Sequence, residues 1–128
     1  MRQTLIGLAL FVIILGSLLT LHVWSVFFVE LTLAAIPLAA LLIVVQCWLF
    51  VGVFITAHDA MHGSLAPGRP ALNAVIGALL LFLYAGFGWR KLKTAHMAHH
   101  AYPGSADDPD FNADNPHGFW PWYFLFFR

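Results

Sequence analysis

An all-α integral membrane fold is predicted by two features of the 128-residue sequence. Hydrophobic residues make up 61% of the chain and charged residues only 9%, whereas a soluble domain carries about 25% charged residues. Residues 3–29 and 31–58 contain no Asp, Glu, Lys or Arg. We therefore expect a transmembrane helical hairpin, followed by an interfacial or re-entrant helix and a histidine-bearing cytoplasmic helix.

The two charge-free stretches define the hairpin. A helix that crosses a bilayer needs about 20 mostly apolar residues, so we predict spans over about 5–28 and 33–57. Glu30 falls in the turn between them. The first apolar run continues past His22 and contains no Ala-x-Ala cleavage pattern, which favours a membrane span over a signal peptide. The lipid bilayer is thus the first predicted partner.

The remaining segments differ in character. Residues 71–89 are apolar enough to cross but contain three glycines, and residues 104–118 form a polar loop punctuated by proline. The stretch 119–128 is rich in Trp, Tyr and Phe, which gather at the headgroup level of membranes. We predict an interfacial or re-entrant segment over 71–89, a histidine-box helix over about 90–101, and an aromatic interfacial segment over 119–128.

Five of the seven histidines fall in two clusters, His58-Asp-Ala-Met-His62 and His96-Met-Ala-His99-His100. Each residue of a helix advances by about 100°, so the first pair lies about 40° apart and the second group within an arc of about 100°. Each cluster therefore presents its imidazoles in one direction. Neutral imidazole binds Zn, Cu, Fe and Ni, and ionisable clusters next to apolar spans are usually functional.

Iron is the metal that this donor set favours. A zinc protease requires His-Glu-x-x-His with the Glu as general base, and here Asp59 takes that position. A carboxylate-bridged di-iron bundle requires several glutamates, but Glu30 is the only one. The single cysteine, Cys47, excludes a disulfide or a Cys-based metal site. A bis-histidine haem stays open as an alternative, and we predict a histidine-ligated centre with two irons.

A shared centre constrains the topology. Both clusters must lie on one side of the bilayer, so we predict that 71–89 does not cross it. The basic residues beside the histidines place that side in the cytoplasm by the positive-inside rule. His22 is then assigned to the outer interface, far from the metal. The basic residues concerned are Arg69, Arg90, Lys91 and Lys93.

Carboxylates near the clusters are candidate partners of the ligands. Asp59, Asp107 and Asp108 could orient imidazoles through their N–H groups, although a solvated helix end and a turn with a helix N-cap explain them as well. The six basic and six acidic residues balance, so no basic patch exists for a nucleic-acid partner.

Residues 54–111 also carry a family resemblance. The combination of HDAMHGSLAPGRP, LYAGF and HMAHH resembles the bacterial β-carotene ketolases, within the membrane fatty-acid-desaturase-like superfamily. The resemblance implies an oxygenase that converts the C4 methylene of a β-ionone ring to a ketone. It implies O2 as co-substrate, a carotenoid substrate, an external electron donor such as ferredoxin or a reductase, and the bacterial inner membrane as location.

The family pattern also includes a third histidine cluster, which these 128 residues do not contain. We therefore expect the chain to match the N-terminal half of a ketolase, and to bind iron weakly and turn over poorly by itself. Two other functions stay open. One is a related membrane desaturase or hydroxylase of acyl lipids, and the other is a non-catalytic membrane protein that binds metal or haem for electron transfer.

Overall fold

The computed structural model describes residues 1–126 and is helical throughout, with no strand among these residues. This confirms the all-α prediction. The chain divides into two compact units, residues 1–87 and the residues from Gly88 onward, and each is described by itself. The last two residues of the predicted aromatic segment, 127 and 128, lie outside the described part.

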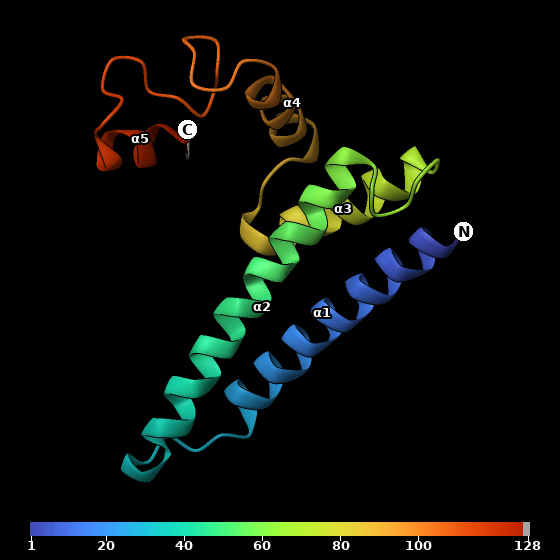
Figure 1. Cartoon of the computed structure of the whole chain (residues 1–128). Coiled ribbons are helices and arrows are strands. Elements are labelled where there is room, and N and C mark those ends of the chain that lie inside the picture. The colour runs from blue at the N-terminus through green and yellow to red at the C-terminus, as the bar shows by residue number, and fades with distance from the viewer. Residues whose placement is uncertain (127–128) are drawn as a thin grey trace. The chain divides into compact units, whose positions relative to one another are not determined.

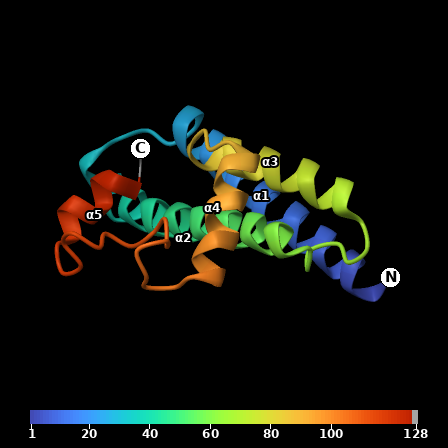
Figure 2. The ribbon, with the colours of Figure 1, turned by 90° about the horizontal axis from the view of Figure 1, so that it is seen from above.

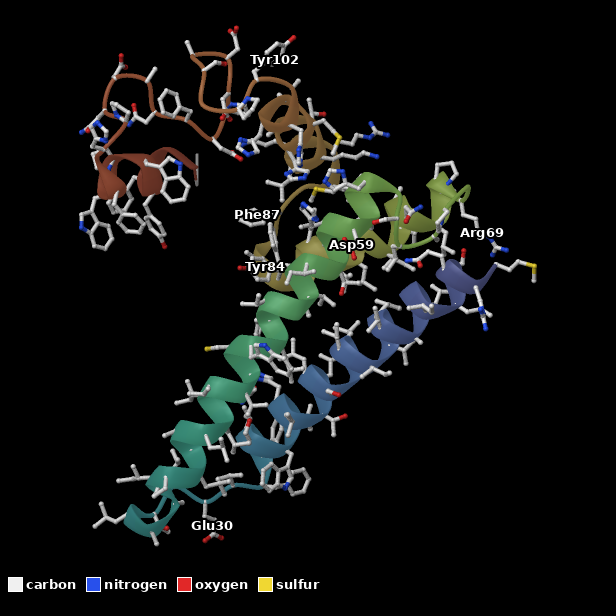
Figure 3. The ribbon with its side chains drawn as sticks, in the orientation of Figure 1. Glu30, Asp59, Arg69, Tyr84, Phe87 and Tyr102 are labelled. Atoms are coloured by element: carbon white, nitrogen blue, oxygen red, sulfur yellow. The ribbon has the colours of Figure 1, made fainter. Side chains whose placement is uncertain are left out.

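Two long helices dominate the first unit. Helix α1 spans Arg2–Phe27, and helix α2 spans Ile36–His62 after a short 3-10 turn, η1, at Leu33–Ala35. The two run antiparallel side by side (Figures 1 and 2). Both α1 and the combined η1–α2 segment are long and apolar enough to cross a membrane, as the charge-free stretches predicted. Figure 3 shows Glu30 and Asp59 at opposite ends of α2.

A polar contact joins α1 to α2 part-way along their length. The Nδ1–H of His22 donates to Oε1 of Gln46 at 3.0 Å, and Nε2 of Gln46 donates to the Ser25 hydroxyl at 3.3 Å. His22, which we assigned to the outer interface from the sequence, thus takes part in a contact between the two helices. In hydrocarbon such a contact has few competing partners, so it fixes how the two helices are rotated against each other.

Helix α3, Pro70–Ala85, packs against the C-terminal half of α2 (Figures 1 and 2). Proline suits its first position because that N–H has no helical partner. Gly86 ends the helix with φ of 70°, the left-handed conformation that glycine adopts without strain. Leu80 and Leu81 are buried, and Tyr84 packs its ring 5.1 Å from that of Phe54 (Figure 3). Tyr84 thus belongs to the packing of α3 on α2.

The outer faces of α1 and α2 remain apolar and uncovered. Val44 is 65% exposed and Trp48 is 74% exposed, and many Leu, Ile and Phe side chains along both helices are similar. Exposed apolar surface of this extent marks an interaction with a partner or a membrane. Together with the lengths of the two helices, it fits a hairpin surrounded by lipid.

The second unit contains two helices joined by a turn-rich loop. Helix α4 spans Trp89–Ala101 and has no buried residue, and helix α5 spans Phe119–Phe126. Between them the chain forms successive turns over 104–118. The indole N–H of Trp122 donates to the backbone oxygen of Asp110 at 2.6 Å, which ties α5 to this loop.

Candidate metal centre

The first histidine pair lies on the last turns of α2. The rings of His58 and His62 are 4.6 Å apart between centroids and tilted by 59°. His58 is partly exposed, and His62 is exposed. The helix continues through both residues and brings them to one face, as their spacing predicted.

The end of α2 is fixed by the backbone that follows it. Gly63 adopts φ of 75°, and its N–H donates to the Ala60 oxygen at 3.1 Å. The backbone N–H and the hydroxyl of Ser64 both donate to the backbone carbonyl oxygen of Asp59 at 3.0 Å. The last carbonyls of a helix otherwise lack partners, so these bonds hold the turn that carries the first histidine pair.

Two residues distant in sequence anchor this turn further. The buried Asn73 side chain of α3 donates to the Ala66 oxygen at 2.7 Å and accepts from the Ala66 N–H at 3.0 Å. Gly7 of α1 meets the Leu65 carbonyl so closely that a Cβ at position 7 would overlap it. The loop 63–69 is therefore clamped from α1 and from α3. Neither Asn73 nor Gly7 is among the site residues predicted from the sequence.

In the second unit His96 and His100 turn toward each other. Their Nε2 atoms are 3.1 Å apart, and their rings meet edge to face at 4.6 Å between centroids. Two nitrogens that each lie about 2.0–2.1 Å from one metal, at an angle of roughly 90–100°, are also about 3 Å apart. The geometry of this pair therefore fits two neighbouring ligands of one metal ion as well as it fits a hydrogen bond.

His99 is held differently. Its Nδ1–H donates to Asp108, with 3.0 Å to each carboxylate oxygen, and Oδ2 of Asp110 lies 3.9 Å away. Asp108 is only 4% exposed. A carboxylate on one ring nitrogen fixes the tautomer and directs the other nitrogen to a metal. The Nε2 atom of His99 is thus the one suited to coordination.

Asp108 organises the loop around itself. Besides His99, it accepts the N–H of Gly104 at 2.8 Å and the N–H of Asp110 at 2.9 Å. His99, Asp108 and Asp110 also place one donor atom each within 4.8 Å of one another, as a cation site would. Because the Asp108 oxygens already accept two backbone N–H groups, its arrangement favours support of His99 over direct metal binding.

These contacts shift the protonation of the trio. The hydrogen bond to Asp108 raises the pKa of His99 against the opposing effect of burial. Burial by itself raises the pKa of Asp108, but the N–H donors of Gly104 and Asp110, together with His99, hold it below its usual value. Burial raises the pKa of Asp110. The charged Asp108 therefore faces the imidazole that it orients.

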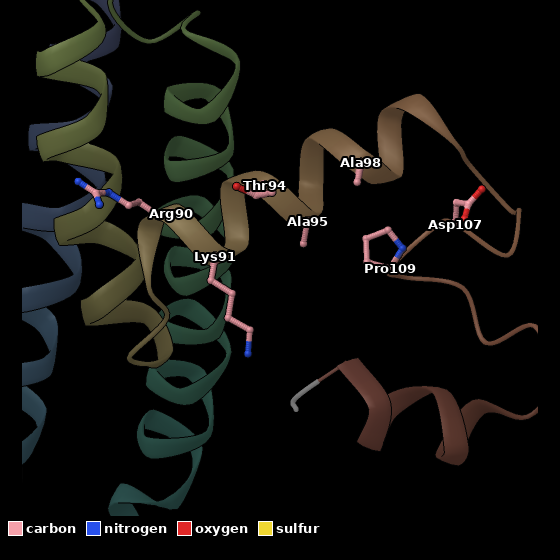
Figure 4. Close-up of a pocket in the computed structure, with 7 residues that line it drawn as sticks. All are labelled: Arg90, Lys91, Thr94, Ala95, Ala98, Asp107 and Pro109. Carbon is pink, nitrogen blue, oxygen red and sulfur yellow. The ribbon is translucent and has the colours of Figure 1, made fainter.

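The other two predicted carboxylates are placed less closely. Oδ1 of Asp59 lies 3.8 Å from Nδ1 of His58, which is beyond hydrogen-bond length, and its side chain is half exposed. Asp107 is exposed and lines an open groove of about 550 Å³ with Arg90 and Lys91 of α4 (Figure 4). Of the three candidate carboxylates, Asp108 is the one that accepts the N–H of His99, a predicted ligand.

Comparisons with known proteins agree with the resemblance of the sequence. The family model described as fatty acid desaturase matches residues 31–128. β-Carotene ketolases of two Paracoccus strains, N81106 / MBIC 01143 and PC1, are 51% identical over 104 residues and 49% identical over 115 residues. These matches cover 80% and 89% of this chain. A zeaxanthin 4-ketolase of Chlamydomonas reinhardtii is 36% identical over 125 residues, which are 90% of this chain.

The matched relatives are longer than this chain. The matches cover 42% and 47% of the two Paracoccus ketolases and 28% of the Chlamydomonas protein. The chain therefore spans less than half the length of the curated relatives. No solved structure matches it. Because the family model covers about three quarters of its residues, the chain belongs to the fatty acid desaturase family.

Proposed function

We propose that this chain forms the metal-binding part of a membrane oxygenase that converts the C4 methylene of a carotenoid β-ionone ring to a ketone. His58, His62, His96, His99 and His100 would hold two irons in common. The observation that carries the proposal is the second cluster: the Nε2 atoms of His96 and His100 are 3.1 Å apart, and Asp108 accepts the Nδ1–H of His99, so that Nε2 of His99 is the nitrogen suited to coordination. The ketolase relatives supply the substrate class.

Iron with O2 would supply the oxidising power that an unactivated C–H bond needs. Two successive hydroxylations at C4, each consuming one O2, two electrons and two protons and releasing one water, would give a gem-diol that loses water to the ketone. The electrons come from an external donor. The residues of this chain contribute ligand geometry: the clamped end of α2 presents one pair of imidazoles, and Asp108 keeps His99 in one tautomer.

The proposed centre lies at the cytoplasmic face of the bacterial inner membrane. Arg90, Lys91 and Lys93 flank the second cluster on α4, and basic residues favour the cytoplasmic side. Helix α3 has 16 residues, or about 24 Å at 1.5 Å per residue, which is shorter than a hydrocarbon core of roughly 30 Å. Its length supports the prediction that this segment does not cross.

Two other functions compete with a ketolase. Bis-histidine haem requires ligands on opposite sides of one iron, whereas the Nε2 atoms of His96 and His100 are only 3.1 Å apart, which argues against this pair as axial ligands. An acyl-lipid desaturase or hydroxylase would use the same histidines, so the products must decide.

The test has two arms. Iron, Mössbauer and absorption analysis of the chain combined with the remainder of a ketolase from a relative should find coupled high-spin irons and no Soret band, whereas the purified chain by itself should bind iron weakly. Expression in cells that make β-carotene should yield 4-keto products by chromatography when the remainder of a ketolase is supplied from a relative, and few or none when the chain is expressed alone. Unsaturated or hydroxylated acyl lipids without ketocarotenoids would contradict the proposal, and so would a haem spectrum.

A further inference from the structure

A narrow groove of about 230 Å³ runs between α1 and α2. Its walls are apolar along most of their length, and its far end is polar. Trp48 and Ile55 at its mouth are 74% and 54% exposed, so the groove opens on the outer surface of the hairpin. The groove is lined by, among others, Leu10 and Ile14 of α1 and Trp48, Gly52, Ile55 and Asp59 of α2.

Gly52 of α2 approaches Ile14 of α1 closely within this groove. A Cβ at position 52 would lie 3.2 Å from Cγ2 of Ile14, so any larger side chain would fill the space between the helices. The nearby Thr56 hydroxyl is already used, because it donates to the Gly52 oxygen at 2.8 Å. The middle of the groove therefore offers an occupant apolar contact and no free hydroxyl donor.

The groove leads to the first histidine pair. Trp48, Gly52, Ile55 and Asp59 follow one another at steps of four, three and four residues along α2, and the next step of three reaches His62. Residues at such spacing lie on one face of a helix. Asp59 also lies beside His58, with 3.8 Å between Oδ1 and Nδ1. An apolar molecule inserted from the lipid side would thus point its end at the proposed iron ligands.

We infer that this groove seats the ring end and the adjoining polyene of a β-carotene-type substrate, which enters from the hydrocarbon phase of the membrane. The inference rests on the proposed function. A carotenoid is apolar throughout, so it resides in the hydrocarbon phase, where the mouth of the groove opens. The apolar walls would bind it by burying its apolar surface. Asp59 marks the end of the apolar walls, beside the imidazoles where C4 is to be oxidised.

The experiment measures binding rather than turnover. The purified chain without metal, reconstituted in lipid nanodiscs, is titrated with β-carotene while tryptophan fluorescence is recorded. The Trp48→Phe variant isolates the contribution of Trp48 among the five tryptophans. We expect saturable quenching that the Trp48→Phe variant loses. Gly52→Leu, which fills the groove, should weaken binding about tenfold or more, equivalent to at least 1.4 kcal/mol.

Two further variants control for folding. Ile55→Phe enlarges a side chain that lines the groove and is 54% exposed, so it should weaken binding in the same direction as Gly52→Leu. Gly16→Leu is the matched control, because a Cβ at position 16 of α1 meets nothing within 4 Å; it should bind as the wild type does. Circular dichroism checks that all variants remain helical.

Several outcomes overturn the inference. Quenching that rises linearly and equally in all variants would show that bilayer acyl chains alone occupy the groove. Equal losses in Gly16→Leu and Gly52→Leu would also refute it. Ketone formation in cells that is unchanged by Gly52→Leu and Ile55→Phe would reject the groove while the proposed function stands. Saturable binding that depends on Gly52, in a protein that makes no ketone, would reject the function while the groove stands.

Discussion

The two histidine clusters of this chain are positioned by different physical means. His58 and His62 lie at the end of a helix that is packed against α3 and capped by a clamped loop, so the backbone directs their imidazoles. Helix α4 has no buried residue, and hydrogen bonds between side chains orient its histidines instead. The first cluster therefore depends on packing and the second on a polar network.

Different kinds of substitution should therefore disturb the two clusters. A substitution that disturbs the packing of α1, α2 and α3 should affect the whole first unit, because close-packed helices transmit strain. A substitution that removes a hydrogen bond in the second cluster should stay local but act on the ligands directly, because the orienting partner of an imidazole controls its tautomer and basicity. Four measurements test this distinction.

The largest effect is expected from His96→Ala. This change removes one of the two nitrogens that face each other at 3.1 Å, so metal affinity should fall by more than about 100-fold, beyond the loss seen when only an orienting partner is removed. Titration of the purified chain with Fe(II) or Co(II), followed by absorption, measures this. His117→Ala, on the exposed part of the loop, is the control and should bind metal normally. Unchanged affinity in His96→Ala would exclude this pair as ligands.

Asp108→Asn should come next. It leaves the shape of the side chain but removes the charge that faces His99, so metal affinity should fall about 10- to 100-fold. The raised pKa of His99 should drop toward its ordinary value, measured by NMR titration of the metal-free chain. Because the pKa of His99 is higher in the folded chain than in the unfolded chain, its protonation stabilises the fold below about pH 6.5, and this stabilisation is lost as the pH rises through the folded pKa.

The neighbouring Asp107→Asn is the matched control for that substitution. Its side chain lines the α4 groove rather than contacting His99, so both the metal affinity and the pKa of His99 should stay as in the wild type. Equal effects of the two substitutions would mean that the acidic run acts through its overall charge and not through one hydrogen bond.

Gly7→Val should destabilise the hairpin by about 1–3 kcal/mol, because the new Cβ overlaps the Leu65 carbonyl. Unfolding in detergent micelles, followed by circular dichroism, measures the loss. Gly16→Val is the control, since nothing lies within 4 Å of its Cβ. The distinction between the clusters predicts that the hydrogen bond of His99 to Asp108, observed by NMR, survives in Gly7→Val. Its disappearance would show that the second cluster also depends on the packed hairpin.

The smallest effect is expected from Gln46→Leu. It removes the contact with His22, and a single hydrogen bond between membrane helices contributes about 0.6 kcal/mol on average. The same unfolding measurement applies, with Cys47→Ala, an exposed position on the same helix, as its control. A loss above about 2 kcal/mol would show that polar contacts, and not packing alone, hold the first unit together.

The helices and the pairing of the histidines could largely be predicted from the sequence, because they depend on the helical repeat and on apolar composition. The absence of charge over 3–29 and 31–58 predicted two long apolar helices, and the four-residue spacings of His58 with His62 and of His96 with His100 predicted that each pair shares a face. Membrane placement, the cytoplasmic side and a shared iron centre remain predictions.

Other features depend on geometry that spacing does not encode. Three aspartates stand within Ala-Asp-Asp-Pro-Asp, and the turn around Gly104 decides that Asp108 faces His99 while Asp107 faces outward. The contact of Gly7 with Leu65 follows from the register of α1 on the loop, which apolar composition leaves undetermined. Asn73 resembles any other polar residue at the start of a helix until its two bonds to Ala66 are seen.

The uninterrupted course of α2 ties its contact with α1 to its histidines. Gln46 lies 12 residues before His58 and 16 before His62, with no break in the helix between them. Removal of a single residue from this interval would turn the imidazoles by about 100° relative to the Gln46 contact, while composition and apolar length stayed nearly the same. Insertions and deletions in this interval should therefore be selected against more strongly than exchanges between exposed apolar residues of similar size.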